Sequence, residues 1–356
     1  MIISKLKVVN FRNLLSQEIE FGSGLNVLHG KNAQGKTNTL EAIYTATIGR
    51  SPRTRKDSEM LAFNKHELQI ELEFLHAKTK RSVKFVLKGN HKSICVDGNN
   101  LKKISDVIGN FGSVYFSPEE LHLVQGSPAY RRRFLDIINC QLSKKYLSEL
   151  QHFQKVLNQR NALLKNQQVE SQILVWNETL AIYAVAIFKE RQKFCKKLQT
   201  LARKIHSELS DGKEELVLGY ESVLKDSDNL KEDYLKGLEK TFEKDKILGY
   251  TSYGLQNDDF SIFLNGVDLR KNGSQGQQRT ATLALKLAEL EILKEEYGEY
   301  PVLLLDDVLS ELDEVRRQKL MERIQNIQCL LTCTEFDLDL PAVKFKVENG
   351  LVNKEE

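Results

Sequence analysis

The sequence is short of several features that would place it in a particular class of protein. Among 356 residues there are only five prolines and one tryptophan. No proline-rich linker marks a domain boundary, and no internal repeat or low-complexity segment is visible. No apolar run approaches the roughly 20 residues of a membrane span, and the N-terminal residues lack the layout of a signal peptide. We therefore expect a cytoplasmic protein without a membrane partner.

The cysteines and the net charge exclude few further classes of protein. The five cysteines are scattered, and no two of them have the C-x-x-C spacing of a zinc or redox motif. An odd, dispersed set is typical of a reducing compartment and favours inert thiols. The formal net charge of +3 is too small to argue for a nucleic-acid partner by itself. The length allows one large or two ordinary domains.

One motif near the N-terminus is specific. Residues 30–37 read G-K-N-A-Q-G-K-T, which matches the phosphate-binding pattern G-x-x-x-x-G-K-[ST]. A β-prone run precedes it, and apolar residues at helical spacing follow over 37–48. Glycine lets the backbone approach phosphates, and the helix N-terminus receives their charge. We predict that ATP is bound by Gly30, Lys31, Asn32, Ala33, Gln34, Gly35, Lys36 and Thr37. In this pattern the lysine reaches the β- and γ-phosphates, and the threonine ligates Mg²⁺.

An acidic pair ends an apolar run in the last third of the chain. Residues 301–305 read P-V-L-L-L, which is typical of a central parallel strand, and Asp306 and Asp307 follow. In such a sheet the carboxyl end of this strand lies beside the phosphate loop. We predict that Asp306 holds Mg²⁺ through water, together with Thr37, and that Asp307 polarises the attacking water. Asp307 and Lys36 are therefore the predicted catalytic residues.

A serine- and glycine-containing segment precedes the acidic strand and leads into a predicted helix over 280–297. Residues 274–278, S-Q-G-Q-Q, resemble the ABC signature, usually written L-S-G-G-Q, and residues 310–313, S-E-L-D, resemble the ABC D-loop. The resemblance implies that Ser274, Gly276 and Gln277 bind the ATP held by a second subunit, and that Asp313 lies at the interface. Two copies would then sandwich two ATP molecules, so that ATP binding drives dimerisation and hydrolysis releases it.

Two departures from the ABC pattern predict slow hydrolysis. ABC ATPases usually end the acidic strand with Asp-Glu, whereas the second carboxylate here belongs to Asp307 and is one methylene shorter. The switch histidine expected after the next strand is missing, and Thr334 and Glu335 are the candidate substitutes.

Further segments resemble the SMC- and RecF-like branch of the ABC superfamily. Residues 6–13, L-K-V-V-N-F-R-N, are similar to its N-x-F-R segment, which implies that Arg12 lies near the nucleotide phosphates. Segments 49–57, 116–119 and 124–136 resemble the RecF family of bacterial recombination mediators more specifically. This resemblance covers essentially the whole chain, and it makes Gln125 the candidate Q-loop glutamine beside the metal.

The chain between positions 36 and 274 is too short for the coiled coil of an SMC protein, and it has no sustained heptad pattern. Much of this stretch has helical texture instead. We therefore expect an α/β fold, with an ABC-type P-loop ATPase head of mixed sheets around the P-loop helix and an inserted helical arm domain. The predicted boundaries are 1–135 and 250–356 for the split head and 136–249 for the arm.

Resemblance to the RecF family implies a function in DNA replication, recombinational gap repair and the SOS response. It implies ATP-dependent dimerisation on single-stranded DNA and on single-strand/double-strand junctions. With RecO and RecR as partners, such a protein would promote RecA loading at gaps. Three basic clusters, 50–56, 78–88 and 131–133, are compatible with phosphate contacts. Solvated surface explains each cluster equally well, as does pairing within the arm for 131–133.

Other functions fit part of the sequence. A soluble ABC ATPase could use the same switch to assemble a protein complex without direct DNA binding. Salt-sensitive DNA binding that ATP enhances would separate the two hypotheses. A structural SMC-like subunit is disfavoured by the short insertion, and a small-molecule kinase needs neither a signature nor a D-loop.

Overall fold

The computed structural model describes residues 1–336 and 340–355, which form two compact units. The first unit comprises residues 1–120 and 286–356, and the second comprises residues 121–285. The predicted arm, 136–249, lies inside the second unit. Segments 121–135 and 250–285, which we assigned to the head, belong to the second unit as well. The boundary between the units at residue 285 lies inside a continuous helix, where no change in residue composition or periodicity could indicate it.

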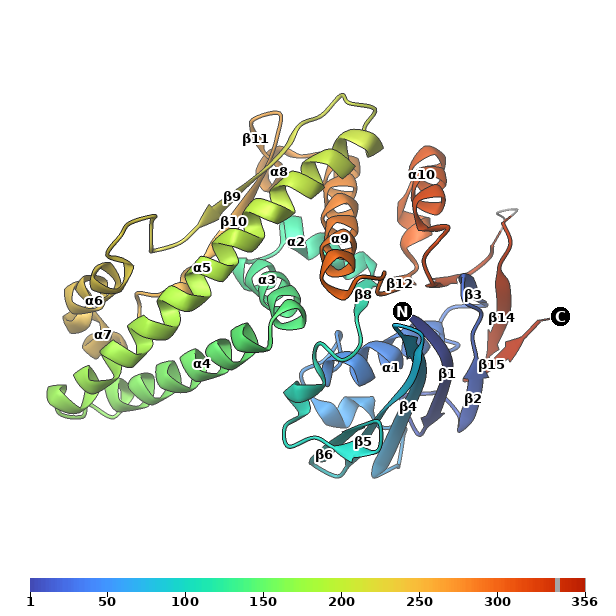
Figure 1. Cartoon of the computed structure of the whole chain (residues 1–356), viewed down its shortest axis with the longest axis horizontal. Coiled ribbons are helices and arrows are strands. Elements are labelled where there is room, and N and C mark those ends of the chain that lie inside the picture. Colours follow the sequence, from blue (N-terminus) through green and yellow to red (C-terminus); the bar gives the residue numbers. More distant parts are fainter. Residues whose placement is uncertain (337–339, 356) are drawn as a thin grey trace. The chain divides into compact units, whose positions relative to one another are not determined.

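The first unit contains a six-stranded sheet in the order β15-β14-β3-β13-β12-β8 (Figure 1). Its strands are β3 (Leu25–His29), β8 (Ser113–Phe116), β12 (Val302–Asp306), β13 (Cys329–Cys333), β14 (Val343–Glu348) and β15 (Leu351–Lys354). All neighbours are parallel except β14 and β15, which form an antiparallel hairpin. Because the central strands are parallel, the carboxyl ends of β3 and β12 share one edge. The loops that follow these two strands therefore meet.

A second sheet of the first unit is antiparallel, in the order β2-β1-β4-β5-β6-β7. Its strands are β1 (Ile2–Val9), β2 (Gln17–Glu20), β4 (Glu67–His76), β5 (Thr79–Lys88), β6 (His91–Val96) and β7 (Asn99–Asn100). Along β4 every second residue from Leu68 to Phe74 is buried. This alternation is the period of a strand with one core-facing side, so the sequence pattern alone determines which side packs inward.

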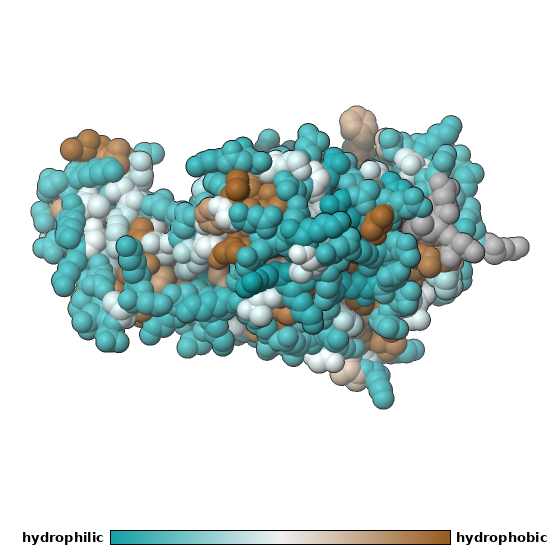
Figure 2. All heavy atoms as spheres, turned by 90° about the horizontal axis from the view of Figure 1, so that it is seen from above, coloured by the Kyte–Doolittle hydropathy of each residue, from teal (hydrophilic) through white to brown (hydrophobic). Residues whose placement is uncertain are grey.

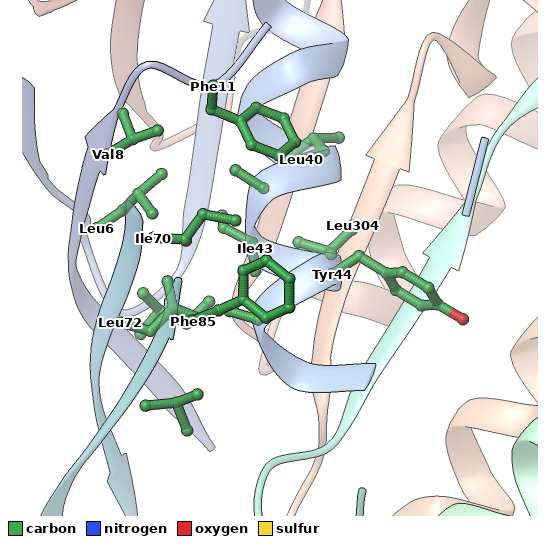
Figure 3. Close-up of a cluster of buried hydrophobic side chains, with 14 of the residues drawn as sticks. Leu6, Val8, Phe11, Leu40, Ile43, Tyr44, Ile70, Leu72, Phe85 and Leu304 are labelled. Atoms are coloured by element: carbon green, nitrogen blue, oxygen red, sulfur yellow. The ribbon is translucent and has the colours of Figure 1, made fainter. Parts of the chain in front are cut away.

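Helix α1 (Lys36–Ile48) packs against both sheets and is buried over most of its length. Figure 3 shows Leu40 and Ile43 among side chains of the antiparallel sheet, and Tyr44 beside Leu304 of the parallel one. A helix that is buried on nearly every side, as this one is, is a core element. Burial of one leucine or isoleucine side chain contributes about 1.5–3 kcal/mol, so this packing fixes the helix that follows the phosphate loop.

Short elements complete the first unit. They are η1 (Asp57–Met60), η2 (Ile104–Val107), η3 (Pro118–Leu121, whose last residue belongs to the second unit), η5 (Val308–Glu311) and α10 (Glu314–Ile324). The five cysteines all lie in the described residues and form no disulfide, and all but Cys95 are buried, which agrees with the expected inert thiols.

The second unit is mainly helical, and its two longest helices, α4 and α5, pack along each other (Figure 1). Its helices are α2 (His122–Gln125), α3 (Pro128–Leu142), α4 (Lys144–Lys165), α5 (Glu170–Leu209), α6 (Leu230–Lys240), α7 (Phe242–Leu248), η4 (Leu255–Asn257) and α8 (Leu269–Asn272). A three-stranded sheet contains β9 (Leu216–Glu221), β10 (Asp259–Leu264) and β11 (Val267–Asp268). Helix α9 (Gln275–Tyr297) begins in this unit and continues into the first.

Buried ion pairs join the helices of the second unit. The fully buried Arg160 of α4 donates to Asp245 of α7 at 3.0 Å. Arg191 of α5 donates to Asp136 of α3 at 3.0 Å and to Asp258 at 2.8 Å. Breaking such a pair by removing one partner costs about 3–5 kcal/mol, so these contacts hold the helices in one arrangement.

By length and composition alone, helix α5 could cross a membrane. A core helix of a soluble protein can have the same length and composition, so this finding is weak evidence for a membrane span. Leu180, Ala184 and Ile187 are buried at helical spacing, which is the stripe of a helix packed on protein. Figure 2 shows a largely hydrophilic face on which apolar residues form small separate groups.

Candidate nucleotide-binding site

The phosphate loop connects β3 to α1, as the motif predicts. Gly30 and Gly35 have φ angles of 143° and 122°, in a region that residues with a side chain rarely adopt. A Cβ at Gly30 would lie 2.4 Å from the carbonyl oxygen of Val347, so the close approach of β14 also requires glycine there. The amide of Gly30 donates to the carbonyl of Thr334 at 3.3 Å, which joins the loop to the segment after β13.

The side chain of Lys36 folds back over the loop. Its ammonium donates to the carbonyl oxygens of Gly30 at 2.5 Å and Lys31 at 2.9 Å. Burial lowers the pKa of Lys36, while the charge of Asp307 is the largest influence that raises it. The ammonium is therefore held inside the loop, where a phosphate oxygen could replace the two carbonyls as its partner.

Thr37 and Asp306 meet directly. The Thr37 hydroxyl donates to Oδ1 of Asp306 at 2.8 Å, and the Thr332 hydroxyl donates to the same oxygen at 2.8 Å. The Tyr115 hydroxyl donates to Oδ2 at 2.8 Å. Burial raises the pKa of Tyr115, so its hydroxyl stays protonated and remains a donor. Three hydroxyls thus fix the orientation of one buried carboxylate.

These oxygen donors fit Mg²⁺, which prefers one or two carboxylates together with phosphate oxygens and water. Within residues 1–336 and 340–355, no group of three or more histidine, cysteine, aspartate or glutamate side chains could hold a metal ion. A magnesium ion at Thr37 and Asp306 would therefore need phosphate or water to complete its shell. That requirement suits an ion that arrives with a nucleotide.

Asp307 follows in a left-handed conformation, with φ at 53°. The Asp307 amide donates to Oγ1 of Thr332 at 2.9 Å and to the Thr332 carbonyl at 3.2 Å. These two hydrogen bonds hold the backbone in this conformation. The residue as a whole is exposed to solvent, although its carboxylate is partly shielded. Burial raises the pKa of Asp307, and a hydrogen bond from Ser310 and the charge of Lys36 partly oppose this shift. A higher pKa suits a group that takes a proton from water.

Arg12 contacts a carboxylate on the P-loop helix. Its guanidinium donates to both oxygens of Glu41, at 3.0 and 2.7 Å. Glu41 is fully buried and also accepts from Ser51 at 2.6 Å and Arg53 at 2.9 Å. The Arg12 side chain therefore contacts α1 through Glu41, and its contact with nucleotide phosphates stays a prediction.

The signature segment and Gln125 both lie in the second unit. The amide of Ser274 donates to Oε1 of Gln277 at 3.0 Å, and the amide of Gln277 donates to Oγ of Ser274 at 3.3 Å, which is a reciprocal helix cap. Ser274 and Gly276 are exposed. The Gln125 side chain donates to Gln278 at 2.7 Å. The structure therefore joins Gln125 to the signature helix, and its metal role stays a prediction.

The D-loop-like segment ends in a helix cap. Oδ1 of Asp313 accepts from the amide of Arg316 at 2.9 Å at the start of α10. This contact accounts for an aspartate at this position, so the interface role of Asp313 stays a prediction.

Comparison with known proteins establishes the family. The family model described as the RecF/RecN/SMC N terminal domain matches residues 2–336. The DNA replication and repair protein RecF of Clostridium tetani is 44% identical over 362 residues, which cover 98% of this chain and 99% of that protein. The chain belongs to the RecF family. The RecF of Clostridium perfringens strain SM101 is 42% identical over 359 residues, covering 99% of both chains.

Solved structures agree with this family assignment. The recombination mediator protein RecF with ATP, from the RecFOR pathway, has a TM-score of 0.94 at 36% identity, covering 100% of this chain and 98% of that one. An Smc head bound to the C-winged helix domain of ScpA has a TM-score of 0.59 at 14% identity, so it shows the fold alone. The predicted RecF family and the ABC-type head fold are thus confirmed.

Within this RecF family member, several predicted basic clusters are partly committed to internal contacts. Arg131 is buried and pairs with Asp259 at 2.6 Å, so among the alternatives left open for this cluster the structure favours internal pairing at this residue. Arg53 is bound to Glu41. The clusters also contain exposed cations, which are Arg50, Arg55, Lys56, Lys78 and Lys80.

Sequence reasoning missed Tyr115 and Thr332, which hold the Asp306 carboxylate. Both occupy strands that neighbour β12, and β8 and β13 are each parallel to it. Their position could be found only once the strand order was known, because neither belongs to a motif.

Proposed function

We propose that this RecF family member binds MgATP in its first unit and uses ATP binding to dimerise on DNA. The observation that carries the proposal is the 2.8 Å hydrogen bond between Thr37 and Asp306, which lie 269 positions apart in the sequence. It joins the phosphate loop to the acidic strand, which are the two halves of an ABC-type site. The solved RecF relative with ATP supports the same assignment.

Each predicted residue has a role that its position allows. The loop amides and the Lys36 ammonium would neutralise the β- and γ-phosphates. Thr37 and Asp306 would hold Mg²⁺, which supplies further charge neutralisation when it is bound. Asp307, whose pKa is raised by partial burial of its carboxylate, would accept the proton of the attacking water. Hydrolysis would be slow because the Asp307 side chain is one methylene shorter than the glutamate of most ABC ATPases.

ATP-dependent dimerisation would use the exposed signature segment. Ser274, Gly276 and Gln277 would bind the γ-phosphate held by the partner subunit, so the nucleotide would contact both copies. ATP favours the dimer to the extent that it contacts the dimer better than the monomer. Gln125 would be coupled to this contact through Gln278 of the signature helix, to which it is hydrogen bonded.

The DNA-repair function follows from the family. The relatives named above are DNA replication and repair proteins, and one solved relative is a recombination mediator of the RecFOR pathway. We propose that this chain binds single-stranded DNA and single-strand/double-strand junctions in the cytoplasm, with RecO and RecR as partners and RecA loading as the outcome. Exposed cations such as Arg50 and Lys80 would contact phosphates, which predicts salt-sensitive, sequence-independent binding.

Light scattering tests the proposal directly. Solution mass is measured with ATP and with ADP, each with and without gapped DNA, for wild type, Asp307→Asn and Lys36→Met. We expect a dimer only with ATP, strengthened by DNA, trapped by Asp307→Asn and abolished by Lys36→Met. A monomer under every condition would refute ATP-driven dimerisation. A dimer with ATP that DNA neither binds nor strengthens would favour the alternative, a switch that assembles a protein complex.

A further inference from the structure

Two chain segments outside the phosphate motif are hydrogen bonded to its outer side. The first is the turn after β1, where the Asn13 side chain donates to the carbonyl of Ala33 at 3.1 Å. The second is the tip of the β14–β15 hairpin, where the Gly350 amide donates to the carbonyl of Gln34 at 3.0 Å. The Asn349 amide also donates to Oε1 of Gln34, at 2.7 Å. Consecutive carbonyls of the loop are therefore held from outside.

Holding a carbonyl also orients the amide of the following residue. A trans peptide is planar, and its carbonyl oxygen and amide hydrogen point in opposite directions. The carbonyl of Ala33 belongs to the same peptide plane as the amide of Gln34. The carbonyl of Gln34 belongs to the plane of the Gly35 amide. With both carbonyls bound on the outside, the amides of Gln34 and Gly35 point to the opposite side, which is the phosphate-binding side of such a loop.

We propose that Asn13 and the hairpin tip at Asn349–Gly350 are positioning residues for phosphate binding. They contact no phosphate themselves, and they act by keeping two peptide planes from rotating. A loop without this support could turn either amide away and leave a phosphate oxygen without its donor. The inference rests on the proposed ATP binding and adds the distant residues that prepare the site for it.

The hairpin tip is itself fixed rigidly enough to serve this role. Asn349 and Gly350 have φ angles of 50° and 79°, which is the two-residue Asn-Gly turn of a tight hairpin. The Gly350 carbonyl accepts from Leu15 at 3.1 Å and from the Gln17 side chain at 2.7 Å. Oε1 of Gln17 accepts in turn from the amide of Val352 at 2.8 Å. Gln17 thus binds the turn and the strand that follows it.

Close packing allows little change at this junction. A Cβ at Gly350 would lie 2.1 Å from the carbonyl oxygen of Asn13. A Cβ at Gly35 would lie 3.2 Å from Oδ1 of Asn13 and 3.6 Å from Cα of Gly350. Glycine at 350 is therefore required both by its φ angle and by the neighbouring turn, and any side chain there would push the hairpin away from the loop.

Three variants and one control test the inference. Asn13→Ala removes the donor to Ala33, Gln17→Ala frees the hairpin tip, and Gly350→Ala displaces it. Asn353→Ala is the control, because this exposed residue lies on the same hairpin without a role at its tip. Dissociation constants are measured without Mg²⁺ for a fluorescent ATP analogue and, by competition, for ADP and inorganic tripolyphosphate. The unfolding temperature of each nucleotide-free variant is measured beside them.

The expected result is a loss of phosphate affinity without a loss of folding. We expect Asn13→Ala and Gln17→Ala to weaken ATP and tripolyphosphate equally, by about tenfold, which is about 1.4 kcal/mol, because each variant frees one amide that would donate to a phosphate oxygen. Gly350→Ala should weaken both ligands at least as much. The nucleotide-free unfolding temperature of Asn13→Ala should stay at the wild-type value, and Asn353→Ala should bind both ligands like wild type.

Two results would overturn the inference. In one, Asn13→Ala and Gln17→Ala bind ATP within twofold of wild type. In the other, ATP weakens but tripolyphosphate does not, which would place the effect at the nucleoside. A wild-type protein that binds no ATP would refute the proposed function together with the inference, so the two failures are distinguishable.

Discussion

Removal of one hydroxyl, in Tyr115→Phe, should weaken the metal site without touching a metal ligand. The Tyr115 hydroxyl donates to Oδ2 of Asp306 at 2.8 Å and is buried. Oδ1 keeps its two donors, Thr37 and Thr332. Without the third donor the carboxylate can rotate, and its second oxygen is left buried and unpaired. Loss of such an outer partner costs about 10–100-fold in metal affinity.

The assay measures the Mg²⁺ concentration that gives half-maximal ATP hydrolysis, and Mn²⁺ binding by electron paramagnetic resonance in the presence of ATP. We expect both to shift by at least about tenfold in Tyr115→Phe. ATP affinity without metal should be unchanged, because the phosphate loop is intact. Tyr300→Phe is the matched control, since its hydroxyl contacts Glu291 and Lys294 in the same unit.

An unchanged metal dependence in Tyr115→Phe would refute the reasoning, because it would show that Thr37 and Thr332 suffice to orient Asp306. A loss of ATP affinity without metal would also contradict it, since that result would place the damage in the phosphate loop.

Three other changes have defined outcomes. Glu41→Ala should lower the free energy of unfolding by about 1–3 kcal/mol in urea titrations, because Arg12, Arg53 and Ser51 lose the carboxylate that accepts their hydrogen bonds. An unchanged free energy of unfolding would contradict this. Arg131→Ala should destabilise the second unit by about 1–3 kcal/mol and leave the salt dependence of DNA affinity unchanged. A weaker salt dependence in this variant would show that Arg131 contacts a DNA phosphate. As the pH is lowered, the rate of hydrolysis should begin to fall at a pH above the ordinary aspartate range, because the pKa of Asp307 is raised and its carboxylate is protonated sooner. A rate that stays constant down to pH 4 would exclude Asp307 as the base.

Most of the proposed ATP site could be predicted from the sequence because its parts are local motifs. Residues 30–37 need only their own order to form a phosphate loop between a strand and a helix. The acidic strand is recognisable from its apolar run, and the strand order then brings Asp306 to Thr37. The helical texture of 136–249 likewise indicated the arm without any knowledge of its packing.

What the sequence could not give were contacts between residues that share no motif. Arg131 belongs to a run of three arginines, yet it is buried against Asp259, which lies far along the chain. Tyr115 and Thr332 reach Asp306 only through the order of parallel strands. In each case the deciding information is which segments become neighbours, and no local pattern contains it.

The conformation of Asp307 offers a physical reason for the shortened acidic pair. Its φ of 53° lies in the left-handed region, which aspartate and asparagine adopt more readily than longer side chains. Asp307→Glu should therefore gain reach toward water and lose backbone compatibility, at a cost of about 1–3 kcal/mol for a strained residue. Asp307→Asn keeps a residue suited to this conformation.

These two variants test whether the reach of the side chain or the strain of the backbone would limit the proposed hydrolysis. If reach limits the rate, Asp307→Glu should hydrolyse ATP faster than wild type while unfolding at lower urea. If the left-handed backbone is what places the carboxylate, Asp307→Glu should be slower as well as less stable. Single-turnover hydrolysis measured beside urea titration distinguishes these outcomes. Asp307→Asn should be as stable as wild type and inactive, which isolates the carboxylate as the chemical group. A stable, faster Asp307→Glu would show that the left-handed backbone does not require the shorter side chain.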